Sequence, residues 1–285
     1  MEKRRRYPTD LSEAEWAVLA PLVPAPKPGG RPARHDRREI CNGIRYGLRS
    51  GGAWRLLPHD LPPWQTVYGY FWTWRRDGTW ERIHEVLRGA VREQAGRDPQ
   101  PSAGIVDSQS VKMTDQGGER GYDAGKKITG RKRHLLVDTL GLLLVVVVLA
   151  AQVQDRDGAK MVFLRAKRRF RRLRLVWADG GYRGRLVRWT VMTCGWGLQI
   201  VKRTDDQRRF VVLPKRWIVE RTFGWLNKWR RLSKDYEVLP QTSEALIQVA
   251  MITLMVRRLA CPRRTAPQAA RARQRPLSAP STRAA

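Results

Sequence analysis

A long apolar run at residues 140–151, broken only by Gly141, limits how this chain can fold. The run is too short to span a bilayer and is typical of a buried β-strand. Around it, predicted strands and helices alternate, which is the order of a mixed sheet flanked by helices. The strands are predicted at residues 105–107, 134–138, 142–150, 174–178 and 198–202, and the helices at 159–170, 184–193, 215–233 and from Thr242 or Ser243 onward. This part of the chain is therefore predicted to be an α/β domain.

Residues 1–95 instead have the periodicity of short helices. Ser12 and Glu15 form a capping-box pattern, and Asp36 is the expected N-cap of a second helix. The spacing of apolar residues predicts further helices from Trp64 and from Trp80. Small helices with arginines on their outer faces favour a helix-turn-helix-like DNA-binding domain, with a plain helical bundle as the alternative.

These patterns divide the chain into four parts. We expect a helical DNA-binding domain at residues 1–95, a linker at 96–104 and the α/β domain at 105–259. Residues 260–285 consist mostly of Pro, Arg, Ala, Ser and Gln, so we expect a disordered basic tail there.

The charge balance indicates a polyanionic partner. The chain contains 56 Lys and Arg against 26 Asp and Glu, a net charge of +30. Such an excess favours nucleic acid, since each cation that neutralises a phosphate releases a counterion, although a basic coat could also serve solubility alone. The 3 cysteines are far apart and form no C-x-x-C, which excludes a disulfide framework or zinc knuckle and favours a reducing cytosol.

Two acids stand at the ends of predicted strands, and a third lies on a late helix. They are Asp107, Asp179 and Glu220. Carboxylates are the ligands that suit Mg²⁺, and a pair of divalent ions can activate the attacking oxygen of a phosphodiester reaction and neutralise the leaving one. Each acid also has a structural alternative: a turn for Asp107, a cap over Gly180-Gly181 for Asp179, and an ion pair with Arg216 or Arg221 for Glu220.

The local sequence around these acids strengthens the metal interpretation. The matching stretches are VDSQSVK (106–112), GYDAGKK (121–127), GRKRH (130–134), WADGGY (177–182), WIVERTFGWL (217–226) and RRLSKDYE (230–237), with GRP (30–32) and WRLLP (54–58) nearer the N-terminus. Together they resemble the DDE transposases of bacterial insertion sequences, in the four/five superfamily. The resemblance extends over residues 8–259.

This resemblance implies a ribonuclease-H-like catalytic fold in which Asp107, Asp179 and Glu220 bind two Mg²⁺ or Mn²⁺ ions. In the family, a Tyr, an Arg and a Lys often surround the last acid. Arg216 fills the Arg position here, whereas Leu213 stands at the Tyr position and Asn227 at the Lys position, beside Lys228. These departures leave Glu220 as the third acid and put a DNA-positioning role for the Lys position in doubt; Arg216 could orient Glu220 or bind a phosphate.

Basic residues outside the carboxylate set are candidate DNA contacts. They are Arg31, Arg37, Arg38, Arg45 and Arg49 near the N-terminus, Lys126, Lys127, Arg131, Lys132 and Arg133 in a predicted loop, and Arg216, Lys228, Arg230 and Arg231 on or after the late helix. A solvated loop is an equally good reading of the second group. His134 is expected to be structural, and Asp138, Asp155 and Asp157 are not expected to bind metal.

The expected activity is cleavage of DNA at transposon ends followed by transfer of the freed 3′-hydroxyl into target DNA. The expected partners are the double-stranded terminal inverted repeats and target DNA, bound by a homodimer or a larger assembly. We expect the protein in the bacterial cytoplasm, associated with the nucleoid and not with a membrane. Two rivals are a non-catalytic DNA-binding repressor and a ribonuclease-H-like nuclease that cuts without joining.

Overall fold

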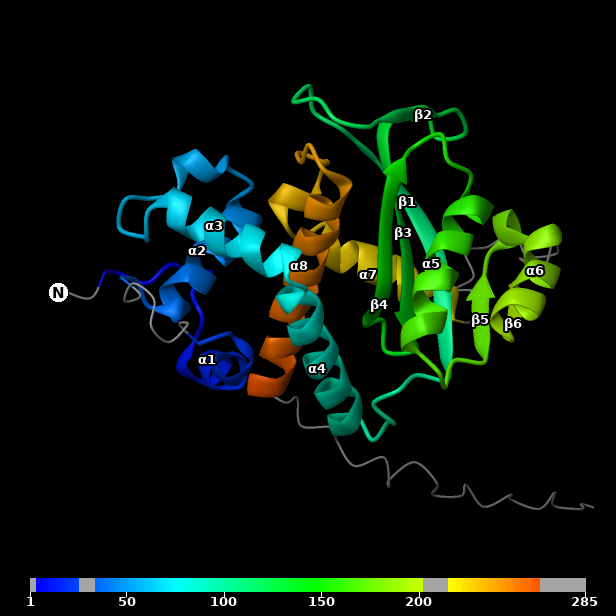
Figure 1. Ribbon diagram of the computed structural model, residues 1–285, viewed down its shortest axis with the longest axis horizontal. Coiled ribbons are helices and arrows are strands. Elements are labelled where there is room, and N and C mark those ends of the chain that lie inside the picture. The colour runs from blue at the N-terminus through cyan, green and yellow to red at the C-terminus, as the bar shows by residue number, and fades with distance from the viewer. Residues whose placement is uncertain (1–3, 26–33, 202–214, 262–285) are drawn as a thin grey trace, which may run out of the picture.

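Figure 1 shows the computed structural model, which describes residues 4–25, 34–201 and 215–261. The N-terminal helices are α1 (Glu13–Leu19), α2 (Arg37–Ser50), α3 (Trp64–Arg76) and α4 (Thr79–Gln94), and the later ones are α5 (Asp155–Arg169), α6 (Arg185–Cys194), α7 (Arg216–Leu226) and α8 (Pro240–Ala260). The strands are β1 (Ala103–Lys112), β2 (Gly121–Asp123), β3 (Ile128–Asp138), β4 (Leu143–Ala150), β5 (Leu175–Ala178) and β6 (Gly197–Ile200). Short 3₁₀ turns are η1 (Ala20–Leu22), η2 (Trp54–Leu56), η3 (Gly180–Tyr182) and η4 (Arg230–Leu232).

The N-terminal helices begin and end where local chemistry predicts. The Ser12 side chain accepts the Glu15 N–H, and the Glu15 carboxylate accepts the Ser12 N–H, which completes the predicted capping box of α1. Asp36 caps α2, and Gly51 ends it in the left-handed conformation at φ 80°. Short-range hydrogen bonds therefore set these boundaries, and the four helices confirm the predicted helical character of this region.

The described strands form one six-stranded mixed sheet in the order β2-β3-β1-β5-β6, with β4 also paired to β3. β1, β3 and β4 pair antiparallel, whereas β1, β5 and β6 pair in parallel. The apolar run forms β4, which is buried along nearly its whole length, as predicted. Within the described part of the chain, no helix is long and apolar enough to cross a bilayer.

Helices cover both faces of the sheet. One face presents Ile105, Leu135 and Trp177 to α7, α8 and the N-terminal helices. The other presents Val106, Leu136 and Val176 to α5 and α6. In Figure 1, α4 and α8 lie between helices α1, α2 and α3 and the sheet. This arrangement confirms the predicted α/β class.

Helix α8 joins the two parts of the chain. It contacts α1, α2 and α4 on one side and β4 on the other. Its apolar residues lie in the same core as those of the N-terminal helices and of one sheet face. A buried ion pair between Arg92 of α4 and Asp138 of β3 crosses the same boundary. The linker predicted at 96–104 begins after α4 and extends into the first two residues of β1. The domain boundary stays a prediction, because one hydrophobic core extends across it.

Two local predictions were wrong. The segment from Lys126 to Arg133, predicted as a loop, includes the first half of β3, because its backbone pairs with neighbouring strands that the local sequence does not reveal. The helix predicted at 215–233 ends at Leu226 and is followed by a separate 3₁₀ turn at Arg230–Leu232. The turn between β3 and β4 is tight: the Asp138 carboxylate accepts the N–H groups of Leu140 and Leu142, and Gly141 has a φ of 79°.

Gly158 tests the close packing of α5 on the sheet. A Cβ at this position would lie 2.2 Å from Cε1 of His134, so we expect Gly158→Ala to lower the free energy of unfolding by about 1–3 kcal/mol through overpacking. The control is Gly69→Ala in α3, where a Cβ would meet nothing within 4 Å and alanine favours the helix. Urea unfolding measures both, and an unchanged midpoint for Gly158→Ala would contradict the packing.

Candidate active site

Two of the predicted acids lie at the same level of the sheet. β1 and β5 pair in parallel, with Ile105 opposite Trp177. Asp107 lies two residues beyond Ile105, and Asp179 two residues beyond Trp177. Parallel strands advance by the same rise per residue, so this register brings the two carboxylates to neighbouring positions. Side-chain alternation places Asp107 on the face that Ile105 shares with α7 and α8.

The electrostatics of Asp107 reflect this proximity. Burial, together with the negative charge of Asp179, raises the pKa of the Asp107 carboxyl to about 6. The Ser108 N–H, which donates to Asp107 Oδ1 at 2.7 Å, acts in the opposite direction, as do the charges of Arg216 and Lys126. Asp107 and Asp179 are therefore close enough to repel each other.

Asp179 also has the capping role that its sequence allows. Its Oδ1 accepts the Gly181 N–H at 2.8 Å at the start of the η3 turn. Its Oδ2 lies 3.8 Å from Nη2 of Arg216. The cap therefore fixes one carboxylate oxygen and leaves the other directed toward the α7 side of the site.

Helix α7 carries the third acid. Thr222 Oγ1 donates to Gly141 O at 2.8 Å, and Arg221 Nη2 donates to Leu140 O at 3.0 Å, which ties α7 to the turn between β3 and β4. Val219 and Phe223 are buried against the sheet. Glu220 lies between these buried positions with 56% of its side chain exposed. It can thus reach toward a ligand at the surface of the site.

Arg216 is a common neighbour of all three acids. Its Nη2 lies 3.4 Å from Glu220 Oε1 and 3.8 Å from Asp179 Oδ2, and its charge lowers the pKa of Asp107. The structure therefore brings Asp107, Asp179 and Glu220 together around one guanidinium group. The ion pair predicted as the structural alternative for Glu220 is also present.

The donor set suits a hard divalent cation. Within the described ranges, no group of three or more aspartate, glutamate, histidine or cysteine side chains is placed so that it could hold a metal ion. The chemistry of the three carboxylates nevertheless fits Mg²⁺ or Mn²⁺, which prefer oxygen ligands. The repulsion between Asp107 and Asp179 is also what a bound cation would relieve.

Comparison with known proteins assigns the chain to a family. A family model described as the transposase DDE domain matches residues 98–255 of the 285, more than half of the chain. The chain belongs to the DDE transposases. A second model, described as a putative transposase of the IS4/5 family, matches residues 11–84. The protein is thus an enzyme that cleaves and transfers DNA strands, and its family uses divalent metal ions.

Two curated relatives are similar to parts of the chain. The transposase is 31% identical over 119 residues to the insertion element IS402 uncharacterized 16.2 kDa protein of Burkholderia cepacia, a match that spans 39% of this chain and 78% of the relative. It is 26% identical over 117 residues to the uncharacterized protein y4sN of Sinorhizobium fredii strain NBRC 101917 / NGR234, spanning 33% and 94% of the two chains. The first of these relatives carries the name of an insertion element.

Solved structures of the Mos1 transposase are more distant. The Mos1 strand transfer complex matches with a TM-score of 0.30 and 13% identity, over 83% of this chain and 78% of that one. The Mos1 paired-end complex with the left transposon end matches with a TM-score of 0.23 and 14% identity, over 83% and 80% of the two chains. The sheet order, with β1 antiparallel to β3 and β1, β5 and β6 parallel, agrees with the ribonuclease-H-like fold that the motif resemblance implies.

Sequence reasoning missed a polar network on the opposite side of β1. Lys132 Nζ lies 3.2 Å from both Asp123 Oδ2 and Asp155 Oδ1. Ser108 Oγ donates to Asp155 at 2.7 Å, and Ser110 Oγ donates to Asp123 at 2.6 Å. The network holds Ser108 and Ser110, which lie on the face of β1 opposite to Asp107. Alternating small polar residues in DSQS were a signal for it.

The predicted contacts at β3 need correction. Lys126 and Lys127 are exposed, as a DNA-contacting role requires. Arg131, Lys132 and Arg133 are instead buried in the sheet, because the chain supplies their partners internally. Arg131 donates to the carbonyl oxygens of Glu237 and Val238, and Arg133 to those of Leu232 and Lys234. We therefore leave these three out of the candidate DNA interface.

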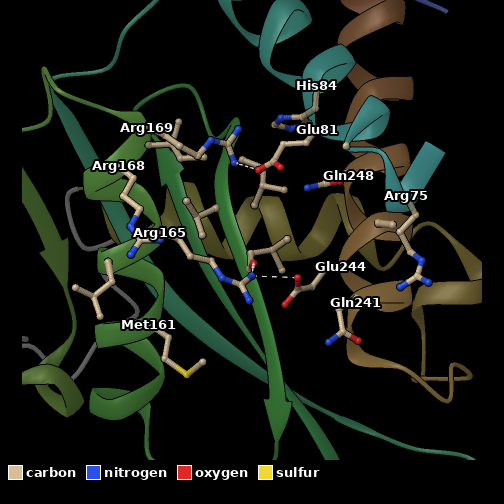
Figure 2. A pocket seen from close by; sticks show the side chains of 17 residues that line it. Arg75, Glu81, His84, Met161, Arg165, Arg168, Arg169, Gln241, Glu244 and Gln248 are labelled. Carbon is tan, nitrogen blue, oxygen red and sulfur yellow. Dashed lines mark hydrogen bonds and ion pairs between the residues drawn. The ribbon is translucent and has the colours of Figure 1, made fainter. Parts of the chain in front are cut away.

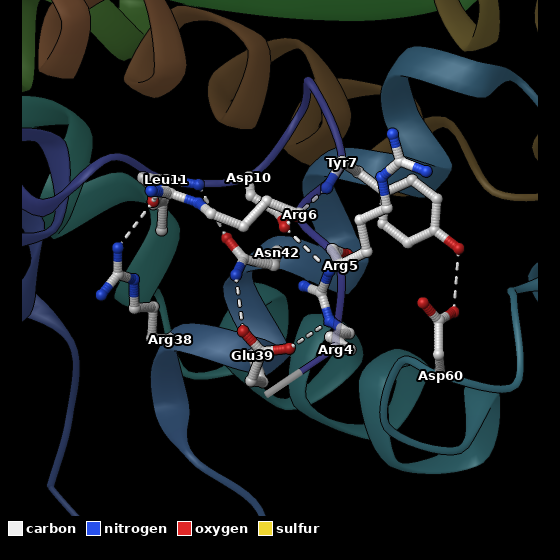
Figure 3. A network of polar contacts seen from close by, with 10 residues as sticks. All are labelled: Arg4, Arg5, Arg6, Tyr7, Asp10, Leu11, Arg38, Glu39, Asn42 and Asp60. Carbon is white, nitrogen blue, oxygen red and sulfur yellow. Dashed lines mark hydrogen bonds and ion pairs between the residues drawn. The ribbon is translucent and has the colours of Figure 1, made fainter. Parts of the chain in front are cut away.

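The N-terminal candidates differ in exposure. Arg45 is buried and pairs with Glu15, so it is not accessible to DNA. Arg38 donates to Leu11 O, as Figure 3 shows, and pairs with Glu13. Arg37 stacks over the Tyr70 ring. Arg49 is exposed, whereas Arg31 and Leu213 lie outside the described residues.

The candidate DNA contacts after α7 also differ in exposure. Lys228 and Arg230 are exposed. Arg231 is buried, where it pairs with Glu237 at 2.8 Å and donates to Gly52 O at 2.6 Å. Arg231 therefore connects this turn to the N-terminal helices and leaves Lys228 and Arg230 as the accessible cations.

We expect Asp107→Asn to stabilise the metal-free transposase at pH 8. The folded pKa of about 6 lies above the usual 3.8, so the fold favours the neutral carboxyl, and its destabilising charge develops as the pH rises from about 3.8 to 6. The free energy of unfolding should rise by at most about 3 kcal/mol at pH 8, and this difference should disappear as the pH falls to 3.8. Urea unfolding in EDTA measures it, with the exposed Asp115→Asn as control. Equal stability of wild type and Asp107→Asn at pH 8 would contradict the crowding of these carboxylates.

Proposed function

We propose that Asp107, Asp179 and Glu220 are the catalytic carboxylates of this transposase and that they bind two Mg²⁺ or Mn²⁺ ions. The observation that carries the proposal is the register of β1 with β5, which brings two acids distant in the sequence to adjacent positions. Arg216 connects them to the acid of α7 through contacts at 3.4 and 3.8 Å.

The residues of the site would fix where the chemistry occurs. Divalent cations supply the Lewis acidity and charge neutralisation that phosphodiester reactions require. Strand β1 and the Ser108 N–H hold the Asp107 carboxylate, and the Gly181 N–H holds that of Asp179. Arg216 orients Glu220, whose side chain is 56% exposed on its helix. Firm placement of two ligands beside an exposed third suits a site that accepts DNA as well as ions.

The proposed reaction has two steps at one site. Water attacks the phosphodiester at a transposon end, and the departing oxygen becomes a free 3′-hydroxyl. That hydroxyl then attacks a phosphodiester of the target in line and displaces a target 3′-oxygen. The number of phosphodiester bonds is unchanged in the second step, so it needs no external energy source.

The proposed substrates are the terminal inverted repeats of the element and a target duplex. The N-terminal helices would bind the repeats, and the exposed cations Arg49, Lys126, Lys127, Lys228 and Arg230 would contact phosphates near the carboxylates. Pairing of two ends would bring two protomers together, and the protein would work with the nucleoid in the bacterial cytoplasm.

Substitution of the carboxylates tests the catalytic assignment. We expect Asp107→Asn, Asp179→Asn and Glu220→Gln each to reduce Mg²⁺-dependent nicking of end DNA by roughly a thousandfold or more, because each removes a charged ligand. DNA binding in EDTA should stay within about twofold of wild type. The exposed Asp115→Asn is the matched control. Full nicking by any one variant would remove that residue from the site.

A strand-transfer assay separates the transposase from its rivals. With pre-nicked ends and Mn²⁺, we expect joined products on a target plasmid from wild type and none from Asp107→Asn. A nuclease that only cuts would give nicks without joined products. A non-catalytic DNA-binding protein would retain end DNA in EDTA and show neither reaction with any metal.

A further inference from the structure

A hollow of about 620 Å³ lies at the junction of α4, α5, α8 and the outer strand β4. Figure 2 shows its walls, with Arg165 and Arg168 on α5, Glu244 on α8 and His84 at the end formed by α4. None of its lining residues belongs to the catalytic carboxylates or to the predicted DNA contacts. It is therefore a separate feature of the surface.

Four arginines line the hollow: Arg75, Arg165, Arg168 and Arg169. Two of them are matched by acids, since Arg165 pairs with Glu244 at 3.1 Å and Arg169 pairs closely with Glu81. Arg75 and Arg168 have no acidic partner within 4.0 Å among residues 4–25, 34–201 and 215–261. The lining thus has an excess of positive charge.

Several polar nitrogens in the lining also lack hydrogen bonds. Arg75 Nε and His84 Nε2 are buried without a partner in the described part of the protein, and so is Arg169 Nη2. Arg169 Nη2 lies 3.5 Å from Glu85 Oε2 without forming a hydrogen bond. A buried polar nitrogen without a partner costs free energy, so the protein keeps these groups beside the hollow at the expense of its stability.

The edge of β4 is closed to a pairing strand. Arg165 donates to Val146 O at 3.1 Å, and Glu244 accepts the Val148 N–H at 3.0 Å. These side chains occupy the outward backbone groups that an added β-strand would need. The exposed apolar residues Met161 and Leu164 could contact a protein, but the excess of guanidinium groups favours a phosphate-bearing ligand.

We propose that this hollow binds the phosphate backbone of a DNA duplex, independently of base sequence and apart from the catalytic carboxylates. DNA is the polyanion that a transposase already handles, and guanidinium groups that contact phosphates position a duplex without reading its bases. The proposal rests on the family's action on DNA and not on the roles of Asp107, Asp179 and Glu220.

The test compares two arginine pairs of equal charge. One variant is Arg75→Gln with Arg168→Gln. The control is Arg97→Gln with Arg171→Gln, which replaces exposed arginines outside the hollow and outside the N-terminal helices. Fluorescence anisotropy in EDTA follows binding to a random duplex over a salt series, and thermal unfolding checks that both variants fold.

Loss of two phosphate contacts should reduce the slope of log K against log salt by about 1.8 and weaken binding about tenfold or more at moderate salt. The control pair should leave the slope unchanged. An equal loss in both variants, or no loss in the hollow variant, overturns the proposal. A change in self-association with unchanged DNA binding also overturns it, because the hollow would then be a protein interface.

Activity assays distinguish which duplex the hollow holds. If it holds target DNA, the hollow variant keeps end nicking and loses strand transfer into a plasmid. If it holds the transposon end, both reactions decline together. Because the binding assay contains EDTA, its result stands even if the proposed carboxylate roles are wrong.

Discussion

Parallel pairing of β1 with β5 is the constraint on which the site depends. The two strands are separated in the sequence by the antiparallel β3–β4 pair and by α5, yet their register sets Asp107 and Asp179 side by side. A slip of one residue would turn one carboxylate to the opposite face. Apolar residues packed on both faces of the sheet oppose such a slip. The core therefore keeps the two carboxylates next to each other.

Buried cations support this sheet from within. Arg131 and Arg133 lie on β3 and hold the segment between α7 and α8 through its carbonyl oxygens, while Lys132 connects β3 to Asp123 and Asp155. Burial lowers the pKa of Arg133 to about 10, which still leaves it charged at neutral pH. Part of the large positive charge of this chain therefore stabilises the fold and does not face DNA.

Local signals predicted the features that depend on short-range interactions. Ser12, Asp36 and Gly141 act within a few residues of themselves, and the apolar composition of β4 reports its burial directly. The burial of Arg131 and Arg133 could not be predicted, because their hydrogen-bond partners lie about a hundred residues away in the chain. The three acids were found through motif resemblance; their convergence around Arg216 required the tertiary structure.

Helix α8 has a consequence for synthesis of the protein. Both the N-terminal helices and β4 pack against it, and Arg257 near its end reaches back to Glu15 in α1. A nascent chain that has not yet exposed residues 240–260 lacks the surface on which both halves close. Folding of the N-terminal region must therefore be completed after translation has passed α8, and a product that stops earlier leaves both halves of the shared core uncovered to solvent.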